Sequence, residues 1–446
     1  MSPPALPSAD DLVRAVTSWL AGRRWFPGDD HSKILAGQCT ARRVGEDMCI
    51  DLVVLVDQVR LNVPLVLTPG EPSAGVITRF EGQWVVDGPM HSAWWQNWRD
   101  QARRVPGCER EPGALVPAGS RMRLVGAEQS NSSFIIEGPA GPLVLKVYRT
   151  LSAGEHPDLH LGAALAGSGW THVATPLACT HLRLDDGEAL SSLLTPLVPG
   201  AVDAFAHFID GASRGRDCRG QAQELGSVTR QMHVRLAEVL GTADPILPQE
   251  LAGRVHGEID RTRAEVPLLD ADLARRLHMC VEPLGRLDRM PLPQRVHGDY
   301  HLGQVLLSSD AARWYVLDFE GEPLRPLEER SRPDLALRDV AGMLRSFGYA
   351  RALGQRQARQ ADSPIDEGAA CTWERQCVRA FLHGWSGGRG LDATEQAVLD
   401  SLVVEKACYE LRYEASMRPT WTDIPLHALE EIAGGRTPEG PGRTAQ

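Results

Sequence analysis

Two short segments carry side chains that could activate a hydroxyl group and bind a metal ion. In the first, His297 to Gln304, the carboxylate of Asp299 is followed five residues later by the amide of Gln304. In the second, Trp314 to Glu320, an apolar run ends in the carboxylate of Asp318. This order is typical of kinase-type phosphoryl transfer, in which the first Asp orients or deprotonates a hydroxyl while the amide and the second Asp hold Mg²⁺ against nucleotide phosphates. We therefore predict Asp299 as the catalytic base and Gln304 and Asp318 as metal ligands.

A simpler interpretation is that Asp299 and His301 cap a turn and that Asp318 only ends a strand, because Asp is common in turns. It would require the order, the spacing and the Val-Leu pair before Asp318 all to be coincidental, so we favour the metal-binding interpretation. Mg²⁺ prefers a few protein oxygens together with water and phosphate oxygens. The usual amide here is Asn, and Gln304 is one methylene longer, so we expect the metal or its helix to be displaced slightly.

Strands joined by turns are predicted between residues 121 and 148. Arg121–Val125 leads into a loop, Glu128–Ser133, and a Gly-Pro-Ala-Gly-Pro turn precedes a strand at Leu143–Tyr148. This layout is typical of the phosphate-covering hairpin of a kinase. As an isolated loop, however, Ser-Asn-Ser-Ser is also ordinary turn chemistry.

Four side chains of this hairpin are candidates for phosphate binding. The loop has no Gly-x-Gly pattern, so backbone amides and the hydroxyls of Ser130, Ser132 and Ser133 would have to contact the phosphates. Lys146 lies in an apolar strand and must end in solvent or against an anion, so we expect it to bind the α and β phosphates.

The C-terminal half is predicted to be helical. Leu225, Val228, Met232 and Leu236 recur at spacings of three and four and would form one face of a helix. His233 lies beside this stripe, and we favour core or rim packing over catalysis for it.

A second long helix, from Asp400 to Met417, carries an unusual pattern of charges. Lys406, Glu410 and Glu414 stand at i, i+4 and i+8 and therefore share one helix face. Taken alone, this pattern indicates a solvated face with one ordinary salt bridge, which contributes a few tenths of a kcal/mol.

Six ordered segments resemble landmarks of the actinobacterial maltokinase-like sugar kinases, relatives of aminoglycoside phosphotransferases within the protein-kinase-like fold. They are Arg24–Gly28, Glu128–Ser133, Pro196–Ala201, Asp318–Pro323, Arg338–Phe347 and Glu405–Glu410. The resemblance covers most of the chain. It implies an α/β, two-lobed protein-kinase-like fold with an additional N-terminal cap subdomain. Residues 1–106 would form the cap, 107–197 the intermediate subdomain and kinase N-lobe, and 198–446 the helical C-lobe.

The same resemblance implies where the nucleotide binds. The base of ATP would lie near Thr195, Leu197 and Val198. A kinase Lys normally pairs with an acidic residue of the next helix, but His160 stands where the family would have that residue. Glu155 and Asp158 therefore remain as alternative partners of Lys146.

For the acceptor site, the resemblance points to Asp299, His301, Glu410, Glu414 and Trp421, with carboxylates accepting sugar hydrogen bonds and the aromatic ring packing against the sugar face. Maltokinases phosphorylate maltose, and a related group phosphorylates glucosamine. Two carboxylates favour an acceptor with an ammonium group, because charged hydrogen bonds are about twice as strong as neutral ones. We favour transfer from MgATP to D-glucosamine, giving glucosamine 6-phosphate, with conversion of maltose to maltose 1-phosphate as the alternative.

Two other classes are less consistent with the sequence. An aminoglycoside phosphotransferase would share the Asp and metal residues, but the long N-terminal region with Arg24–Phe26 is foreign to that group. A non-catalytic nucleotide-binding regulator would not need Asp299 and Asp318 intact.

Composition excludes several partners. The 446-residue chain is too long for a single core, and its net charge of -11 argues against nucleic-acid or anionic-membrane binding. No apolar run approaches the ~20 residues of a membrane span, and the N-terminus lacks a signal-peptide pattern, so we expect a cytoplasmic protein. The nine cysteines have no Cys-x-x-Cys spacing and are expected to be reduced thiols.

Overall fold

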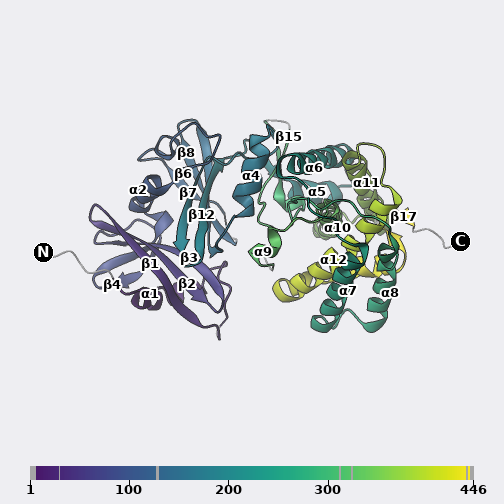
Figure 1. The fold of residues 1–446 in the computed structure, drawn as a ribbon, viewed down its shortest axis with the longest axis horizontal. Helices are drawn as coiled ribbons and strands as arrows, with labels where there is room; N and C mark the ends of the chain where they lie inside the picture. Colours follow the sequence, from purple (N-terminus) through teal and green to yellow (C-terminus); the bar gives the residue numbers. More distant parts are fainter. Residues whose placement is uncertain are drawn as a thin grey trace. The chain divides into compact units, whose positions relative to one another are not determined.

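The computed structural model describes residues 7–29, 31–126, 130–310, 313–322, 325–437 and 440–441. The chain divides into two compact units: unit 1 comprises Met1–Ala163 and Ala174–Leu197, and unit 2 comprises Ala164–Val173 and Val198–Gln446. Unit 1 is rich in strands and unit 2 in helices (Figure 1). The sequence analysis also places a boundary after residue 197, whereas its boundary at residue 106 lies within unit 1. The division into three regions stays a prediction.

The first sheet of unit 1 is antiparallel, in the order β1-β2-β3-β5-β4 with β10 beside β3. Its strands are β1 (Ile34–Val44), β2 (Asp47–Val56), β3 (Val59–Thr68), β4 (Val76–Phe80), β5 (Gln83–Asp87) and β10 (Thr150–Leu151). β2 and β3 are rich in Val, Leu and Ile, which suit a pleated and buried surface. Helix α1 (Ala9–Ala21), capped by the Ser8 side chain, packs Leu12, Val16 and Leu20 against these strands.

The second sheet of unit 1 has the order β6-β11-β12-β9-β8-β7. Its strands are β6 (Arg103–Arg104), β7 (Met122–Leu124), β8 (Asn131–Gly138), β9 (Gly141–Tyr148), β11 (Ala178–Leu184) and β12 (Gly187–Pro196). The hairpin of β8 and β9 is the one predicted from the sequence. The predicted loop residues Glu128 and Gln129 lie outside the described residues.

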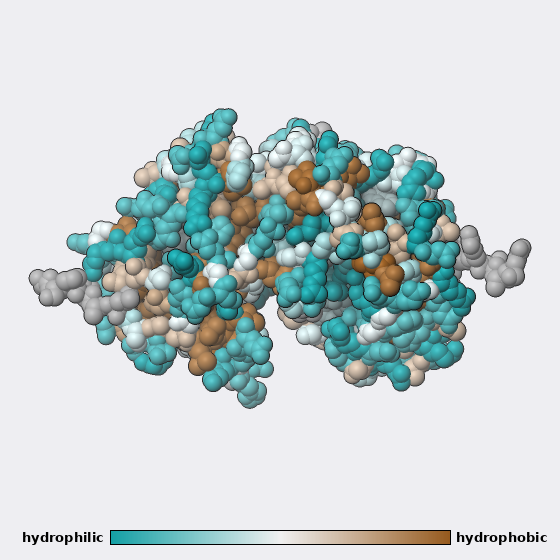
Figure 2. All heavy atoms as spheres, viewed as in Figure 1, coloured by the Kyte–Doolittle hydropathy of each residue, from teal (hydrophilic) through white to brown (hydrophobic). Residues whose placement is uncertain are grey.

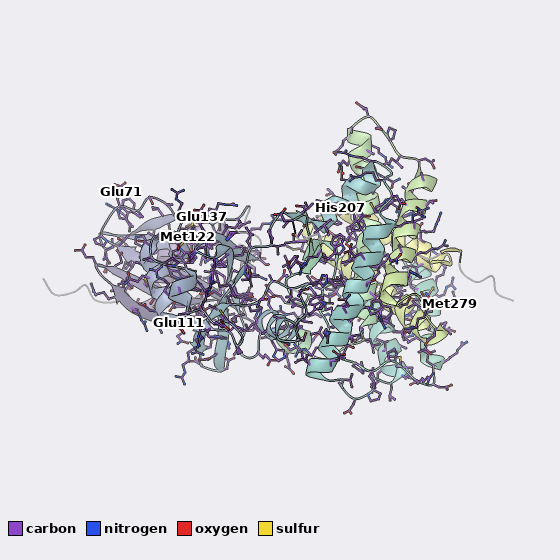
Figure 3. All side chains as sticks on the ribbon, turned by 90° about the horizontal axis from the view of Figure 1, so that it is seen from above. Glu71, Glu111, Met122, Glu137, His207 and Met279 are labelled. Atoms are coloured by element: carbon purple, nitrogen blue, oxygen red, sulfur yellow. The ribbon has the colours of Figure 1, made fainter. Side chains whose placement is uncertain are left out.

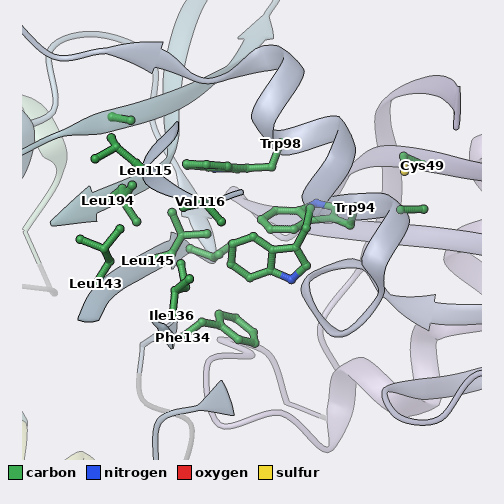
Figure 4. Close-up of a cluster of buried hydrophobic side chains, with 14 of the residues drawn as sticks. Cys49, Trp94, Trp98, Leu115, Val116, Phe134, Ile136, Leu143, Leu145 and Leu194 are labelled. Atoms are coloured by element: carbon green, nitrogen blue, oxygen red, sulfur yellow. The ribbon is translucent and has the colours of Figure 1, made fainter. Parts of the chain in front are cut away.

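Tryptophans of helix α2 (Ser92–Gln101) join the two sheets of unit 1. Trp94, Trp95 and Trp98 are buried in one hydrophobic cluster with Val66 of the first sheet and Leu145 of the second (Figure 4). These rings therefore belong to the core of unit 1. Unit 1 also contains η1 (Gly88–Met90) and α3 (Pro112–Leu115), and α4 (Pro157–Gly167) begins in unit 1 and ends in unit 2.

Unit 2 contains a central helix, α10 (Leu337–Gln360), in which every residue from Asp339 to Arg351 is buried. A helix buried on all sides must be surrounded by other elements. The other helices are α5 (Ala204–Ser213), α6 (Arg219–Leu240), α7 (Pro248–Glu265), α8 (Ala271–Val281), α9 (Leu327–Arg330), α11 (Glu367–Trp385), α12 (Ala393–Met417) and α13 (Asp423–Ala433). Short turns of 3₁₀-helix are η2 (Leu284–Arg286), η3 (Leu302–Gln304) and η4 (Pro419–Trp421).

Helices α6 and α11 approach each other closely through two glycines. A Cβ atom at Gly226 would lie 2.0 Å from the carbonyl oxygen of Phe381, and one at Gly384 would lie 2.0 Å from that of Gln223. No larger side chain fits at either position without moving a backbone, so the crossing of these two helices is fixed.

A small antiparallel sheet of unit 2 positions the two chemical segments. It consists of β13 (Ala201–Asp203), β14 (Val305–Ser308) and β15 (Arg313–Val316). Val305 pairs with Val316, and the Leu317 amide donates to the carbonyl oxygen of Gln304 at 2.9 Å. Gln304, the last residue of η3, therefore lies beside Leu317, which precedes Asp318. At the C-terminus, β16 (Arg436–Thr437) pairs with β17 (Gly440–Pro441).

The face drawn in Figure 2 is mostly hydrophilic, with small hydrophobic groups scattered over it. Exposed hydrophobic side chains include Met279, which is labelled in Figure 3. None of the described helices is long and apolar enough to cross a membrane. All nine cysteines are free of disulfide bonds, as predicted.

Candidate active site

The loop that carries Asp299 is held in place by hydrogen bonds from its backbone amides. The Asp339 carboxylate accepts hydrogen bonds from the amides of His297 and Gly298 at 2.8 and 2.9 Å. Gly298 has a φ of +87°, a conformation that suits glycine. The His297 ring donates from Nε2 to the carbonyl oxygen of Leu317 at 2.8 Å, because that oxygen can only accept. The loop is therefore tied to the residue preceding Asp318.

Asp299 is paired with a lysine whose side chain is 13% exposed. Lys406 Nζ, from helix α12, lies 2.9 Å from Asp299 Oδ1 and 2.9 Å from Glu322 Oε1. Burial alone would raise the pKa of Asp299, but Lys406 and His301 outweigh it and hold this pKa below its usual value. The pKa of Lys406 is raised, because the two carboxylates outweigh its burial. Asp299 is thus a carboxylate near neutral pH and can accept a hydroxyl hydrogen.

The sequence analysis missed this role of Lys406. It placed Lys406 on a charged helix face, whereas the side chain is largely buried and directed at Asp299. A usable signal was present, because Glu405 and Lys406 stand between the apolar residues Val403, Val404 and Ala407, and a Lys in such a run needs a partner.

The predicted metal ligands flank the β14–β15 pair: Gln304 directly precedes β14, and Asp318 follows β15 after Leu317. Gln304 ends η3, and its side-chain amide makes no hydrogen bond to any described residue. Asp318 has a φ of +62°, a strained conformation that is found preferentially at functional sites. One carboxylate oxygen of Asp318 and one of Glu320 lie within 4.8 Å of each other. Glu320 was not singled out in the sequence, although an Asp-x-Glu spacing could have pointed to it.

A pocket of about 310 Å³ opens beside Asp299 within unit 2. It contains all five residues assigned to the acceptor site from the sequence: Asp299, His301, Glu410, Glu414 and Trp421. His301 Nε2 lies 3.9 Å from Asp299 Oδ2. Four further aromatic residues that the sequence analysis did not identify also line the pocket: Phe205, Tyr349, Tyr409 and Tyr413.

The two glutamates of the pocket have different hydrogen-bond partners, and Glu414 is buried whereas the Glu410 side chain is 13% exposed. Glu410 Oε2 accepts a hydrogen bond from Arg345 Nε at 2.9 Å. Glu414 Oε1 accepts from the Tyr349 hydroxyl at 3.2 Å and from Arg418 at 2.8 Å, whereas its Oε2 atom is buried with no hydrogen-bond partner among the described residues. Burial raises the pKa of both carboxyl groups. The alternative of a solvated helix face is therefore wrong.

Residues proposed for the nucleotide lie in unit 1, apart from Val198, the first residue of the second segment of unit 2. Lys146 Nζ is 3.0 Å from Asp158 Oδ2, while Glu155 pairs with His160 at 2.6 Å. Of the two alternatives left open by the sequence, Asp158 is thus the partner of Lys146.

The three serines of the hairpin face different ways. Ser133 stands directly opposite Lys146 in the β8–β9 pair, so both side chains share one face of the sheet. Ser132 points to the other face, is 2% exposed, and accepts a hydrogen bond from Arg149 Nε at 2.9 Å. The predicted contact of the Ser132 hydroxyl with phosphate is therefore wrong, because its direction is set by the alternation of the strand. Ser130 precedes β8.

Thr195 lies in the last part of β12, opposite Val144 of β9. The Leu197 amide donates to the carbonyl oxygen of Pro142 at 2.9 Å, and Val198 is buried. Nothing in these contacts distinguishes a nucleotide site from an ordinary strand end, so their role stays a prediction.

Comparison with known proteins agrees with this arrangement. Residues 121–373 match the phosphotransferase enzyme family. The chain is 27% identical over 415 residues to a glucosamine kinase of Streptacidiphilus jiangxiensis, covering 87% of this chain and 89% of that protein. It is 26% identical over 328 residues to a glucosamine kinase of Mycolicibacterium smegmatis, covering 70% and 79%.

A solved structure of a glucosamine kinase in complex with glucosamine, ADP and inorganic phosphate aligns with a TM-score of 0.64 and 21% identity, covering 96% of this chain and 99% of that one. A TM-score of this size over nearly the whole chain means that the two folds are alike. Together with the family match, this confirms the predicted protein-kinase-like fold.

Proposed function

We propose that this chain, which belongs to the phosphotransferase enzyme family, is an ATP-dependent sugar kinase that converts D-glucosamine to glucosamine 6-phosphate. The observation that carries the proposal is the pocket in which Asp299 lies together with the carboxylates of Glu410 and of the buried Glu414. The names of the relatives, which are glucosamine kinases, point to the same acceptor.

In the proposed reaction, the sugar hydroxyl attacks the γ-phosphorus of ATP. A new sugar O–P bond forms, the bond to the β-phosphate oxygen breaks, and ADP leaves. Asp299 orients the hydroxyl and accepts its proton, and Lys406 keeps Asp299 ionised for this task. Such catalysis depends mainly on positioning and on charge stabilisation.

An aminosugar suits the pocket because of one unsatisfied atom. Glu414 Oε2 is buried without a hydrogen-bond partner among the described residues, which costs free energy unless a ligand supplies a donor. An ammonium group supplies three donors and a compensating charge. Trp421 and the tyrosines of the pocket offer flat apolar faces for the sugar ring.

Gln304, Asp318 and Glu320 offer the oxygen donors that Mg²⁺ prefers, and the amide of Gln304 is not engaged by another described residue. The residues therefore fit the ion, with Gln304 and Asp318 as the predicted ligands and Glu320 as an addition from the structure. When bound, Mg²⁺ would neutralise charge on the nucleotide phosphates.

For the nucleotide, Lys146 would bind the α and β phosphates, with Asp158 holding its ammonium group in place. Ser130 and Ser133 stay candidates for phosphate contacts, and Thr195, Leu197 and Val198 for contacts to the base.

The proposal is tested by ADP release with four acceptors: glucosamine, glucose, maltose and kanamycin. We expect the highest kcat/KM with glucosamine, and ³¹P-coupled NMR of the product should place phosphate on O6. A clear preference for maltose would replace the proposal by the maltokinase alternative. A preference for kanamycin would indicate a resistance enzyme, and ADP release with none of the four would contradict a sugar kinase.

A further inference from the structure

Two histidines on neighbouring helices of unit 2 face each other outside the acceptor pocket. His256 belongs to α7 and His278 to α8, and these two helices pack against each other (Figure 1). The Nδ1 atoms of the two rings lie 2.7 Å apart, and the ring centroids are 4.9 Å apart. Neither ring lines the acceptor pocket. The His278 side chain is 31% exposed, so the pair can be reached from solvent.

Asp260 determines where the hydrogens of this pair lie. It stands four residues after His256 on α7, and its Oδ1 atom lies 3.1 Å from Nε2 of His278. An ionised carboxylate can only accept, so Nε2 of His278 donates to it and Nδ1 of His278 keeps a free lone pair. The hydrogen in the 2.7 Å contact therefore belongs to Nδ1 of His256. A metal ion between the rings would take the place of this hydrogen, which moves to Nε2 of His256.

The contact with Asp260 is one that metal-binding histidines usually make. Such a histidine donates its second ring N–H to a carboxylate, a backbone carbonyl or water, which fixes the orientation of the ring. Asp260 does this for His278. Burial and the neighbouring His278 lower the pKa of His256, so this ring is neutral near pH 7, as a metal ligand must be.

The distance between the two nitrogens favours a right-angled geometry. Metal–nitrogen bonds to histidine are about 2.0–2.1 Å long, so two nitrogens bound at a right angle lie about 2.9 Å apart, and two bound at the tetrahedral angle about 3.3 Å apart. The observed 2.7 Å is nearer to the first value. Square arrangements of nitrogen and oxygen ligands are typical of Cu²⁺ and Ni²⁺, whereas Zn²⁺ prefers a tetrahedron.

We propose that His256 and His278 bind one divalent transition metal ion, Ni²⁺ or Cu²⁺, with Asp260 holding the His278 ring in place. Among the described residues, no third His, Cys, Asp or Glu offers a ligand atom within 4.8 Å of both nitrogens, so water completes the coordination. The ion joins α7 to α8, and both helices pack against α12. Binding should therefore raise the unfolding temperature. The site lies outside the proposed reaction and does not rest on it.

The experiment uses Ni²⁺ as the probe, because Cu²⁺ can oxidise the nine free cysteines. Calorimetric titration with NiCl₂ and with ZnCl₂ is carried out on the full chain at about pH 8, where histidines are neutral, with excess MgCl₂ to occupy sites made of oxygen ligands. The unfolding temperature is measured with and without NiCl₂. The variants are His256→Gln, His278→Gln and Asp260→Asn. His427→Gln is the matched control, because it removes an exposed histidine of unit 2 and leaves the pair intact.

We expect wild type and His427→Gln to bind Ni²⁺ equally, more tightly than Zn²⁺, and to unfold at a higher temperature in its presence. Asp260→Asn should weaken Ni²⁺ binding by about tenfold to a hundredfold. His256→Gln and His278→Gln should weaken it further and lose the shift in unfolding temperature, because Gln supplies no ring nitrogen.

Ni²⁺ binding that is the same in wild type, His256→Gln and His278→Gln would overturn the proposal, as would tighter binding of Zn²⁺ than of Ni²⁺. If a histidine variant does not fold, Asp260→Asn still decides, because Asp260 is exposed and its replacement leaves the core untouched. Unchanged Ni²⁺ affinity in Asp260→Asn would then refute the site.

Discussion

Replacing Glu414 by Gln removes one charge from the acceptor pocket with little change in shape. Glu414 is 2% exposed, and its Oε1 atom already has the Tyr349 hydroxyl and Arg418 as donors. Oε2 is the buried atom without a partner among the described residues. The amide of Gln can keep its oxygen in the Oε1 position, so the change is concentrated at Oε2. There an N–H donor would replace an acceptor and would face the ammonium group of an aminosugar.

The size of the effect follows from the interaction lost. A hydrogen bond between charged groups contributes about 1.5–3 kcal/mol. With about 1.36 kcal/mol for each factor of ten, Glu414→Gln should lower kcat/KM for glucosamine by about 12-fold to 160-fold. Glucose has a hydroxyl where glucosamine has its ammonium group and should lose about 0.5–1.5 kcal/mol, which is about twofold to 12-fold. The ratio of kcat/KM for glucosamine to kcat/KM for glucose should therefore fall.

The assay is ADP release at varied sugar concentration and saturating MgATP for wild type and variant. Tyr349→Phe is a matched control, because it removes a donor to Oε1 and leaves the charge in place. It should lower both activities in similar proportion. Equal proportional losses of glucosamine and glucose activity in Glu414→Gln would refute the aminosugar assignment, even if the enzyme remains a sugar kinase.

Three further predictions concern the catalytic loop and its neighbours. Asp299→Asn should abolish turnover while calorimetry shows nearly unchanged MgATP binding, and a residual rate above about a tenth of wild type, which is ~1.4 kcal/mol of barrier, would remove Asp299 as the base. Asp318→Ala should raise the Mg²⁺ concentration needed for half-maximal rate, and Gln304→Asn should be tolerated because Asn is the usual ligand; a Mg²⁺ titration unchanged in Asp318→Ala would contradict this. The pKa of Asp339 lies below its ordinary value of 3.8, so its stabilising contribution is present above that pH and is lost as the pH falls further. Urea unfolding at a series of pH values should show a steeper loss below about pH 4 in wild type than in Asp339→Asn, and parallel curves would refute the shift.

The sequence was most informative where the signal consists of residues that are close together along the chain. Asp299, Gln304 and Asp318 were predicted as site residues from their spacing, and the β14–β15 pairing places their two segments side by side. The hairpin around Lys146 was also predicted, since strand periodicity and a Gly-Pro turn are local signals.

Contacts between distant segments could not be predicted in the same way. Lys406 and Asp299 are 107 residues apart, and no local pattern says that a helical lysine ends at the catalytic loop. Asp158, the partner of Lys146, lies in the first turn of α4, whereas Glu155 precedes this helix, so the choice between them depends on where the helix begins. Ser132 and Ser133 are neighbours in β8 and therefore point to opposite faces of the sheet, because side chains alternate along a strand. Which of the two shares a face with Lys146 depends on the pairing register, which the sequence does not show.

The charges of the acceptor pocket argue for a small cation and against a large one. Asp299 pairs with Lys406, Glu410 with Arg345 and Glu414 with Arg418, so each of the three carboxylates already has a basic partner. A ligand with a single ammonium group can use the open Oε2 atom of Glu414 without displacing these pairs. A polycationic aminoglycoside would have to place several ammonium groups beside Lys406 and Arg418, where like charges repel. Glucosamine should therefore be accepted and kanamycin rejected for an electrostatic reason.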